Sequence, residues 1–371
     1  MRICIEAQTL NHHWRSGLLT YTEGLVNSLY ARDARNDYRL VFYSLRRTAE
    51  QMPGPSARNF RKHTLRLPDR EFPAGQFLKD HAVLPYFLKK HRIDVFHRPA
   101  GYTLPRARGV FRILTVHDLR TLTMKDSLWP QDIGRYKRSL QEADICVTVS
   151  ECTKQDIIEH FGLSPSKIKV VPLAVADRFR PQSQEKIRAL KEKWNIRGPY
   201  FLSVGSVPRK NIEGIIRAFA RARIPQESVL VMTCRMELEK YQSLAHDLGV
   251  GERVLFLKHL NDNELVTLYA GCQCLLFPSL YEGFGLPILE AMQCGVPVIT
   301  SHLSSCPEVA GDAAIFVDPR KSDEIAHAIE QISGDRALRA ALIEKGLNRV
   351  KLFHWDKVAL EMEKVYASAR S

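Results

Sequence analysis

The sequence lacks several signatures that would each identify a different class of protein. No apolar run reaches the roughly 20 residues that span a bilayer, which argues against a helical membrane protein. No G-x-G-x-x-G follows the first predicted strand, which argues against a nicotinamide-dependent dehydrogenase. An Asp-x-Asp pair for a divalent metal and a C-x-x-C pair for a metal or redox centre are also missing.

The eight cysteines lie mostly in apolar surroundings, which is typical of buried, reduced thiols. Metal or redox roles are the alternative. Residues 1–5 have the pattern of a strand, and not of a signal peptide with an apolar run and a small-residue cleavage site. These features predict a protein that is made and kept in the cytosol.

Length and charge indicate two domains of unequal character. A chain of 371 residues exceeds what one hydrophobic core usually spans, so two domains of roughly 150–200 residues are expected. The net charge is +13, and residues 1–180 hold 30 Lys and Arg against 18 Asp and Glu. Residues 181–371 hold 24 against 23. The basic excess therefore belongs to one half, as a binding surface would.

Short apolar, β-branched runs alternate with helical patterns, which is typical of parallel sheets with crossover helices. Strands are predicted near 2–7, 38–43, 62–67, 93–97, 110–116, 144–149 and 168–172. After a turn-rich linker they are predicted near 200–204, 228–233, 253–257, 273–277, 296–300 and 313–317. The simplest architecture is α/β, with two facing, doubly wound, Rossmann-like parallel-sheet domains. We place the first at 1–180 and the second at 181–350.

The loop after the predicted strand 273–277 carries the most informative chemistry. Gly283 and Gly285 permit a close backbone approach, and Pro287 suits the first turn of a helix. The N-terminus of that helix would offer N–H groups and a positive dipole end to a phosphate. Glu282 lies before the helix and Glu290 about one turn inside it, which fits the two hydroxyl-bearing ends of a nucleotide-diphosphate sugar. Alternatively, Glu282 caps the helix and Glu290 pairs with a surface lysine.

A second loop, residues 204–211, follows the predicted strand 200–204. Gly205 opens it, and the adjacent cations Arg209 and Lys210 lie before a helix that Asn211 would cap. Such cations can neutralise a diphosphate. A solvated pair of charges is the alternative, but a leaving diphosphate needs cations when no Asp-x-Asp pair holds a metal.

Two loops of the first half complete the set. His117 ends a predicted strand, where its imidazole could hydrogen-bond a sugar hydroxyl or the reacting centre while Asp118 orients the ring. A satisfied structural histidine fits this pattern equally well. Gly17 precedes the first long helix and would let backbone amides approach a phosphate.

Together these segments resemble a known family. Residues 278–299, PSLYEGFGLPILEAMQCGVPVI, resemble the E-x7-E signature of the retaining glycosyltransferases of family 4. Further matches, in the family's order, are RSGLLTYTEGL (15–25), TVHDL (115–119), VTVSECTKQDI (147–157), VGSVPRKN (204–211) and SSCPEVAGDAAIFVDP (304–319). The chain departs from the family at 18–20, Leu-Leu-Thr, where Ile-Gly-Arg is frequent. The resemblance implies the GT-B architecture, with a C-terminal helix at 351–371 that packs back on the first domain.

The resemblance also implies roles for individual residues. Glu290 would hold the ribose hydroxyls, Glu282 would face the donor sugar, and His117 would lie near the sugar 6-hydroxyl and the anomeric centre. Arg209 and Lys210 would clamp the diphosphate. The catalytic set is then His117, Glu282, Arg209 and Lys210, and the donor-binding set is Gly17, Gly205, Arg209, Lys210, Glu282, Gly283, Phe284, Gly285, Leu286 and Glu290. Ser150 and Glu151 match a family position near the cleft and receive no role.

The family implies hexose transfer with retention at the anomeric carbon, in cell-surface polysaccharide biosynthesis. The segments 15–25 and 116–119 are most similar to bacterial mannosyltransferases, which makes GDP-mannose the favoured donor. No cofactor and no metal are expected, because the cationic pair and the helix N-terminus could stabilise the leaving diphosphate. A sugar-nucleotide 2-epimerase-like isomerase and a non-catalytic nucleotide-sugar binding protein are the other two classes considered.

The first domain generally holds the acceptor in this architecture, here a glycan or a polyprenyl- or lipid-linked glycan. Basic stretches at 58–70, 89–92, 98–112 and 135–138, with the apolar residues of 72–88 between the first two, indicate docking on an anionic membrane surface. In the alternative, the aromatic residues belong to the core and the charges are merely solvated. Nucleic acid is not an expected partner, because no recognition motif accompanies the charge. The prediction is a cytoplasmic protein that docks peripherally on the inner face of the cytoplasmic membrane.

Overall fold

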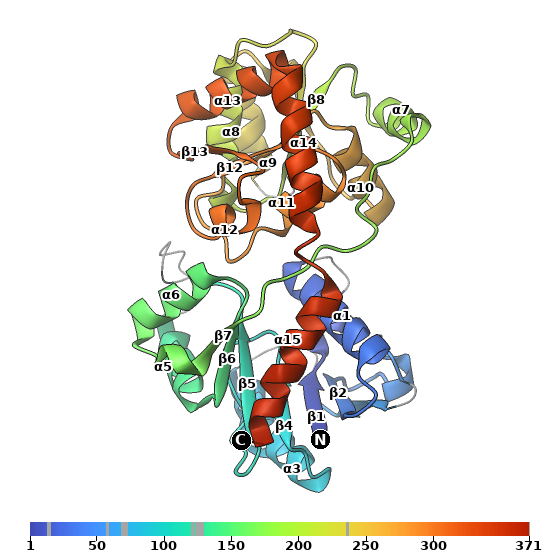
Figure 1. The fold of residues 1–371 in the computed structure, drawn as a ribbon, viewed down its shortest axis with the longest axis vertical. Coiled ribbons are helices and arrows are strands. Elements are labelled where there is room, and N and C mark those ends of the chain that lie inside the picture. Colours follow the sequence, from blue (N-terminus) through green and yellow to red (C-terminus); the bar gives the residue numbers. More distant parts are fainter. Residues whose placement is uncertain are drawn as a thin grey trace. The chain divides into compact units, whose positions relative to one another are not determined.

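The computed structural model describes residues 1–12, 16–56, 59–67, 73–119, 122, 130–234 and 237–370, without the side chains of 73–74 and 130–132. The described chain forms two compact units (Figure 1). The first unit comprises Met1–Ala174 and His354–Ser371, and the second comprises Val175–Phe353. Because the chain leaves the first unit and returns to it, its last helix belongs with its first half.

One parallel sheet forms the centre of the first unit. Within the described residues it has seven strands in the order β3-β2-β1-β4-β5-β6-β7. The strands are β1 (Arg2–Glu6), β2 (Asp37–Tyr43), β3 (Phe60–Leu65), β4 (Val95–Arg98), β5 (Phe111–Val116), β6 (Ile145–Thr148) and β7 (Ile168–Val170). Most residues of β1, β2, β4 and β6 are buried, as expected for strands of a parallel sheet that helices cover on both faces.

Helices cover this sheet and begin at residues that suit helix ends. Ser16 Oγ accepts a hydrogen bond from the N–H of Leu19, and Ser150 Oγ accepts one from the N–H of Thr153, so both serines are N-caps. The helices and helical turns are η1 (Gln8–Asn11), α1 (Gly17–Arg32), η2 (Ala49–Gln51), α2 (Pro73–Leu78), the π-helical η3 (Lys79–Val83), α3 (Leu84–Lys90), α5 (Pro130–Glu142), α6 (Glu151–Phe161), η4 (Pro165–Lys167), α15 (Trp355–Ala367) and η7 (Ser368–Arg370).

The C-terminal helix α15 packs on α1 (Figure 1). Gly24 makes this contact possible, because a Cβ atom placed on it would lie 2.3 Å from the indole ring of Trp355. At the other end of the pair, Glu363 accepts hydrogen bonds from Arg32 at 3.1 Å and from Arg35 at 2.7 Å. The last helix is therefore an integral part of the first unit.

The second unit repeats the strand order of the first around its own parallel sheet. Six strands among the described residues lie in the order β10-β9-β8-β11-β12-β13. They are β8 (Tyr200–Val204), β9 (Val229–Thr233), β10 (Val254–Phe256), β11 (Cys274–Phe277), β12 (Val298–Ser301) and β13 (Ile315–Val317). The helices are α7 (Gln184–Lys193), η5 (Pro208–Lys210), α8 (Ile212–Arg221), α9 (Leu238–Asp247), η6 (Gly251–Arg253), α10 (Asp262–Gly271), α11 (Leu286–Gln293), α12 (Cys306–Ala310), α13 (Ser322–Gly334) and α14 (Arg336–Val350).

These two doubly wound sheets confirm the predicted α/β, Rossmann-like fold class, including a C-terminal helix on the first unit. Seven of the eight cysteines are buried, Cys152 is half-buried, and the described structure contains no disulfide. Among the described helices, none combines the length and the apolar character needed to cross a bilayer. In each sheet the parallel strands end at one edge, and the loops there carry the predicted site residues.

Candidate functional site

The second unit brings its predicted residues together at the carboxyl ends of β8 and β11. Gly205 follows β8 with a φ angle of +117°, and a Cβ atom placed on it would lie 2.9 Å from Cγ of Lys210. Glycine is therefore needed for the backbone conformation and for the close packing of the lysine stem. The carbonyl of Arg209 accepts a 2.8 Å hydrogen bond from the N–H of Leu280, which ties the loop after β8 to the loop after β11.

Arg209, Lys210 and Glu282 form an ion cluster between these two loops. Lys210 Nζ donates to Oε1 of Glu282 at 2.6 Å, and Arg209 Nη1 lies 2.6 Å from Oε2. Arg209 Nη1 also donates to the carbonyl of Tyr281 at 3.0 Å, and Lys210 Nζ lies 4.1 Å from the ring centroid of Phe277. The family resemblance implies that Arg209 and Lys210 bind the diphosphate and that Glu282 faces the donor sugar. The structure joins all three directly.

The buried carboxylate of Glu282 and the two cations around it stabilise each other's charges. Burial opposes ionisation of Glu282, which is 5% exposed, but Lys210 and Arg209 outweigh burial and lower the pKa of its carboxyl. Burial also lowers the pKa of the Lys210 ammonium, and Glu282 partly offsets that effect. With all three groups ionised, two cations face one carboxylate. The cluster then keeps a net positive charge where the low dielectric strengthens its attraction for an anion.

Glu282 does not cap the helix that follows it. The N-cap of α11 is Gly285, with a φ angle of +103°, and the Glu282 carboxylate is engaged with the cations. Gly283, Phe284 and Leu286 are buried in the same turn. The alternative interpretation of Glu282 as a helix cap is therefore wrong, and the carboxylate belongs to the ion cluster.

Two serines after β12 fix the backbone of this turn. The N–H of Glu282 donates to Ser304 Oγ at 3.0 Å. Ser305 Oγ contacts the carbonyls of Glu282 and Phe284 at 2.9 and 2.8 Å. Both serines belong to the segment 304–319, which carries part of the family resemblance, but no role was predicted for them. Their position directly after a strand of the same sheet was the available signal.

Asn211 also has a role that the sequence analysis missed. It occupies the N-cap position of α8 with a φ angle of +59°, but its side chain makes no cap hydrogen bond. Instead, Nδ2 donates to the carbonyls of Pro278 at 3.2 Å and Pro319 at 2.6 Å. Asn211 is thus the N-cap residue, as expected, but its side chain does not cap the helix. This side chain joins the loops that follow β8, β11 and β13.

Glu290 lies on α11, one turn after the helix begins, and it is half-buried. Tyr269 Oη, on α10, donates to Glu290 Oε2 at 2.7 Å. Burial raises the pKa of the Glu290 carboxyl. The alternative pairing with a surface lysine is not what the structure has, because the partner is the buried Tyr269. That partner fixes one carboxylate oxygen and leaves the second to accept hydrogen bonds.

His117 follows β5 in the first unit and is half-buried. Its Nε2 lies 2.7 Å from the carbonyl oxygen of Pro99. The ring of Tyr21 meets the imidazole edge-on, with centroids 4.8 Å apart. The atom that orients the ring is therefore the Pro99 carbonyl, where the sequence analysis expected the Asp118 side chain. Burial lowers the pKa of His117, so the ring is neutral at neutral pH.

Gly17 and Ser150 have contrasting surroundings in the first unit. Gly17 is the first residue of α1, and a Cβ atom placed on it would meet nothing within 4 Å, so packing within the described structure does not require glycine. Ser150, by contrast, is explained locally as the N-cap of α6. Glu151 is exposed and forms an ion pair with Lys154 at 3.1 Å.

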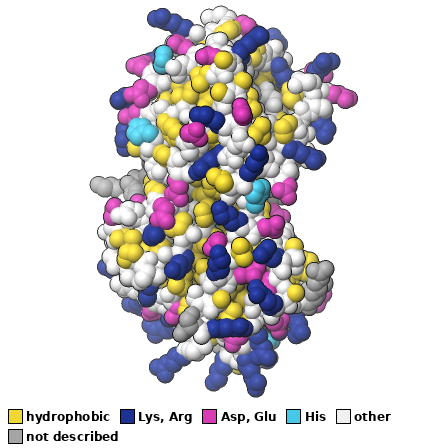
Figure 2. All heavy atoms as spheres, viewed as in Figure 1, with side chains coloured by type: hydrophobic (Ala, Val, Ile, Leu, Met, Phe, Trp, Pro, Cys, Tyr) yellow, Lys and Arg dark blue, Asp and Glu magenta, His cyan; other side chains and the backbone are white. Residues whose placement is uncertain are grey.

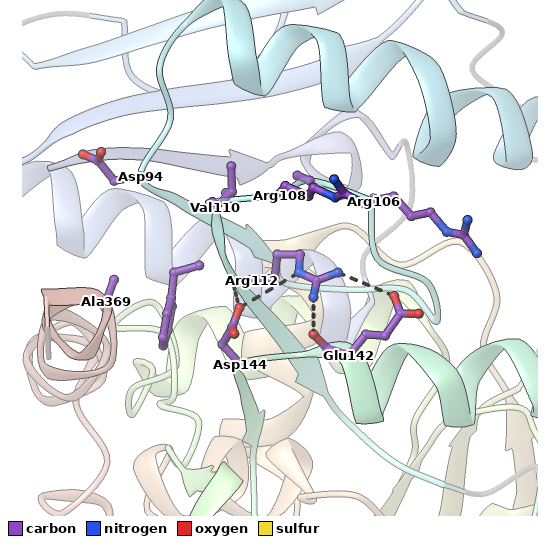
Figure 3. Close-up of a pocket in the computed structure, with 11 residues that line it drawn as sticks. Asp94, Arg106, Arg108, Val110, Arg112, Glu142, Asp144 and Ala369 are labelled. Atoms are coloured by element: carbon purple, nitrogen blue, oxygen red, sulfur yellow. Dashed lines mark hydrogen bonds and ion pairs between the residues drawn. The ribbon is translucent and has the colours of Figure 1, made fainter.

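A hollow lies at the opposite edge of the first sheet (Figure 3). Arg112, at the start of β5, donates to the carbonyl of Glu142 at 2.6 Å and lies 3.5 Å from its carboxylate. Asp144 accepts a 2.7 Å hydrogen bond from the backbone N–H of Arg112. None of the predicted site residues lines this hollow. Within the described chain, no group of three His, Cys, Asp or Glu side chains is placed to hold a metal ion.

The sequence matches two family models in succession. Residues 16–178 match "Glycosyltransferase Family 4", and residues 185–349 match "Glycosyl transferases group 1". The chain is 32% identical over 298 residues to O-antigen chain mannosyltransferase B of Escherichia coli, an alignment that covers 75% of each protein.

Solved structures with the same fold accompany these sequence matches. Sucrose-phosphate synthase of Thermosynechococcus elongatus superposes with a TM-score of 0.78 at 22% identity, over 99% of this chain and 98% of that one. Anabaena Alr3699/HepE in complex with UDP-glucose superposes with a TM-score of 0.76 at 17% identity, over 99% of this chain and all of the other.

Proposed function

Because the chain belongs to glycosyltransferase family 4, we propose that it is a retaining, metal-independent hexosyltransferase that moves mannose from GDP-mannose to a growing surface glycan. The glycan, free or carried on a polyprenyl or other lipid, is the acceptor. The mannosyltransferase relative supports the choice of sugar, and its printed name supports an O-antigen type of product. The HepE complex with UDP-glucose supports a nucleotide-sugar donor.

The observation that carries this proposal is the ion cluster at two strand ends, in which half-buried Arg209 and Lys210 face the buried Glu282. An ammonium group has three donors, and Lys210 uses one on Glu282, so the others remain for a diphosphate oxygen. Glu282 holds both cations in place before the donor binds. Charge that is oriented in advance stabilises a leaving group without reorganisation during the reaction.

The proposed reaction proceeds on one face of the sugar. The bond between the anomeric carbon and the diphosphate oxygen breaks, and its electron pair leaves with the nucleoside diphosphate. The acceptor hydroxyl oxygen bonds to the same face of that carbon, and its proton passes to the departing phosphate oxygen. Arg209, Lys210 and the N-terminus of α11 would stabilise the negative charge of the leaving group. The second oxygen of Glu290 would accept from the ribose.

We predict that GDP release from GDP-mannose requires a glycan acceptor and persists in EDTA. The measurement is nucleotide release with and without acceptor, for a panel of GDP- and UDP-sugars. A UDP-sugar preference would change the donor and leave the reaction class intact. Strict dependence on Mg²⁺ would contradict the metal-free scheme.

The same assay separates the two competing classes. A sugar-nucleotide 2-epimerase-like isomerase would release free nucleotide with no acceptor present. A non-catalytic binding protein would bind the donor and release nothing. Binding is read by thermal shift, because a ligand at 100 times its Kd adds about 2.7 kcal/mol to the stability of a protein.

We also propose that the first unit docks on an anionic membrane surface to reach a lipid-linked acceptor. Along residues 75–92 the single acidic side chain is Asp80, and it is buried. The exposed large side chains there are apolar or basic: Phe77, Leu78, His81, Tyr86, Lys89, Lys90 and Arg92. Lysine and arginine side chains gather at the α3 end of this unit (Figure 2). Leu84, Phe87 and Leu88, by contrast, belong to the core, so the exposed set is smaller than the sequence suggested.

We expect the double variant Lys89→Ala, Lys90→Ala to bind anionic vesicles about 30-fold less tightly than the natural chain. Each cation near an anionic surface contributes about 1 kcal/mol, and about 2 kcal/mol corresponds to about 30-fold. Flotation with phosphatidylglycerol vesicles at low salt measures this. Lys186→Ala with Arg188→Ala removes two exposed cations of the second unit and is the matched control. Absence of vesicle binding by the natural chain would refute membrane docking.

A further inference from the structure

A chain of four polar side chains crosses the interior of the first unit. Tyr366 Oη lies 2.9 Å from Nδ1 of His97, and His97 Nε2 lies 2.8 Å from Oγ1 of Thr115. Thr115 Oγ1 in turn lies 3.2 Å from Oη of Tyr21. The Tyr366–Tyr21 chain thus joins four elements, α15, β4, β5 and α1, through residues that are at most 1% exposed.

Burying four polar side chains destabilises a protein unless each of them forms hydrogen bonds. A buried hydroxyl or imidazole without a partner loses its hydrogen bonds to water and gains nothing in return. Here each ring nitrogen of His97 has a hydroxyl partner, and Thr115 bridges two of the other members. Burial lowers the pKa of His97 to about 3, so the imidazole stays neutral. Satisfied polar networks of this kind fix the positions of their members more narrowly than apolar contacts do.

The chain ends against His117. The ring of Tyr21, held at its hydroxyl by Thr115, stands edge-on to the imidazole of His117 at 4.8 Å and 78°. A shift of Tyr366 would therefore be passed through His97 and Thr115 to the ring that contacts His117. Through these contacts the last helix of the protein supports a side chain that lies 249 residues earlier in the sequence.

A second contact fixes which nitrogen of His117 carries the proton. A carbonyl oxygen only accepts hydrogen bonds, so the 2.7 Å contact with Pro99 places the proton on Nε2. In the neutral ring Nδ1 is then an acceptor, and within the described structure no residue donates to it. The Pro99 carbonyl is itself well anchored, because the preceding Arg98 is fully buried and pairs with Asp80 at 2.9 Å and with Glu6.

We propose that the Tyr366–Tyr21 chain is a positioning network that holds His117 with Nδ1 free to accept a hydrogen bond from a hydroxyl of the donor sugar. This inference rests on the proposed function and on the role that the resemblance of residues 115–119 implies for His117, near the 6-hydroxyl of the donor sugar. Tyr366, His97, Thr115 and Tyr21 touch no reacting atom and act through His117. In consequence α15 contributes to turnover as well as to the fold.

Tyr366→Phe tests the network, and Tyr38→Phe is its matched control. Both remove one hydroxyl from a fully buried tyrosine of the same unit. Tyr38 Oη donates to Asp33 Oδ2 at 2.7 Å and is not a member of the Tyr366–Tyr21 chain, and phenylalanine keeps the ring that meets Tyr366 edge-on with centroids 6.4 Å apart. We expect Tyr366→Phe to lower kcat at least about tenfold with little change in KM for the donor, since misplacing a positioned group by an ångström can cost 100-fold. Tyr38→Phe is expected to keep its kcat. Equal kcat values for the two variants would overturn the proposal.

Nitrogen NMR gives a readout that does not depend on activity. In protein with nitrogen-15-labelled histidine, the signals of His117 are those that are absent from the spectrum of His117→Gln. For His117 in the natural chain we expect one neutral tautomer, with the proton on Nε2. In Tyr366→Phe we expect exchange between tautomers or ring positions, and in Tyr38→Phe the natural spectrum. A proton on Nδ1 in the natural chain would overturn the proposal. Full activity of His117→Gln would refute the role of His117 in the proposed function, whereas the tautomer measurement would still report on the network.

Discussion

Replacing Lys210 with alanine is expected to lower kcat by at least about 100-fold at saturating donor. The loss of one donor oriented in advance toward developing negative charge costs about 100- to 1000-fold in kcat. Lys210 fits that description, because its side chain is half-buried and its Nζ lies 2.6 Å from Glu282 Oε1 and 4.1 Å from the ring centroid of Phe277. Without it, Glu282 would offset the charge of Arg209, and the site would lose its net positive charge.

Two further variants separate the charge of Lys210 from its packing. Lys210→Met keeps an unbranched stem to pack against Gly205 and removes only the ammonium, so it should lose as much activity as Lys210→Ala. Lys240→Ala removes an exposed lysine whose Nζ lies 2.6 Å from Glu213, and it should retain full activity. A change of less than threefold in a Lys210→Ala protein that melts like the natural chain would remove Lys210 from the mechanism.

The fold was largely predictable because its strands are continuous apolar runs. Residues 200–204 were predicted as a strand and form β8 with those bounds, and 273–277 were predicted as a strand and form β11 (Cys274–Phe277). Parallel strands buried on both faces need such runs, and crossover helices need the 3.6-residue period. Helix ends were less predictable, since Ser150, the N-cap of α6, received no role from the sequence pattern.

Strand order predicted which loops of the site lie close together, but not which side chains contact one another. Parallel strands end at one edge, so Lys210 after β8 and Glu282 after β11 were expected near one another, but their direct ion pair was not. Nothing local indicated that Asn211 would bind carbonyls 67 and 108 residues away, or that Tyr366 would reach His97. Such contacts depend on side-chain positions that only the packed structure sets. The roles of the site residues toward a donor remain predictions.

Glu290 is expected to contribute mainly to binding of the nucleotide. Its Oε2 is occupied by Tyr269 Oη at 2.7 Å, so Oε1 is the atom available to the ribose hydroxyls. A hydrogen bond to a charged group contributes about 1.5–3 kcal/mol, which corresponds to about 10- to 150-fold in Kd. Burial raises the pKa of the Glu290 carboxyl, because it removes the carboxylate from water. A hydrogen bond donated by a ribose hydroxyl would therefore stabilise the ionised carboxylate strongly.

Glu290→Ala should therefore weaken GDP binding by about 10- to 150-fold and leave kcat at saturating donor within about threefold. Titration calorimetry with GDP measures the first, and turnover at several donor concentrations the second. Glu330→Ala is the matched control, since Glu330 is a half-buried glutamate of α13 that accepts 2.7 Å from the N–H of Arg223. Tyr269→Phe keeps the carboxylate but removes the hydrogen bond to Oε2. Its loss of GDP affinity should lie between those of Glu290→Ala and Glu330→Ala. Unchanged GDP affinity in Glu290→Ala would show that this carboxylate does not bind the nucleotide, because a ribose contact cannot be lost without a cost in Kd.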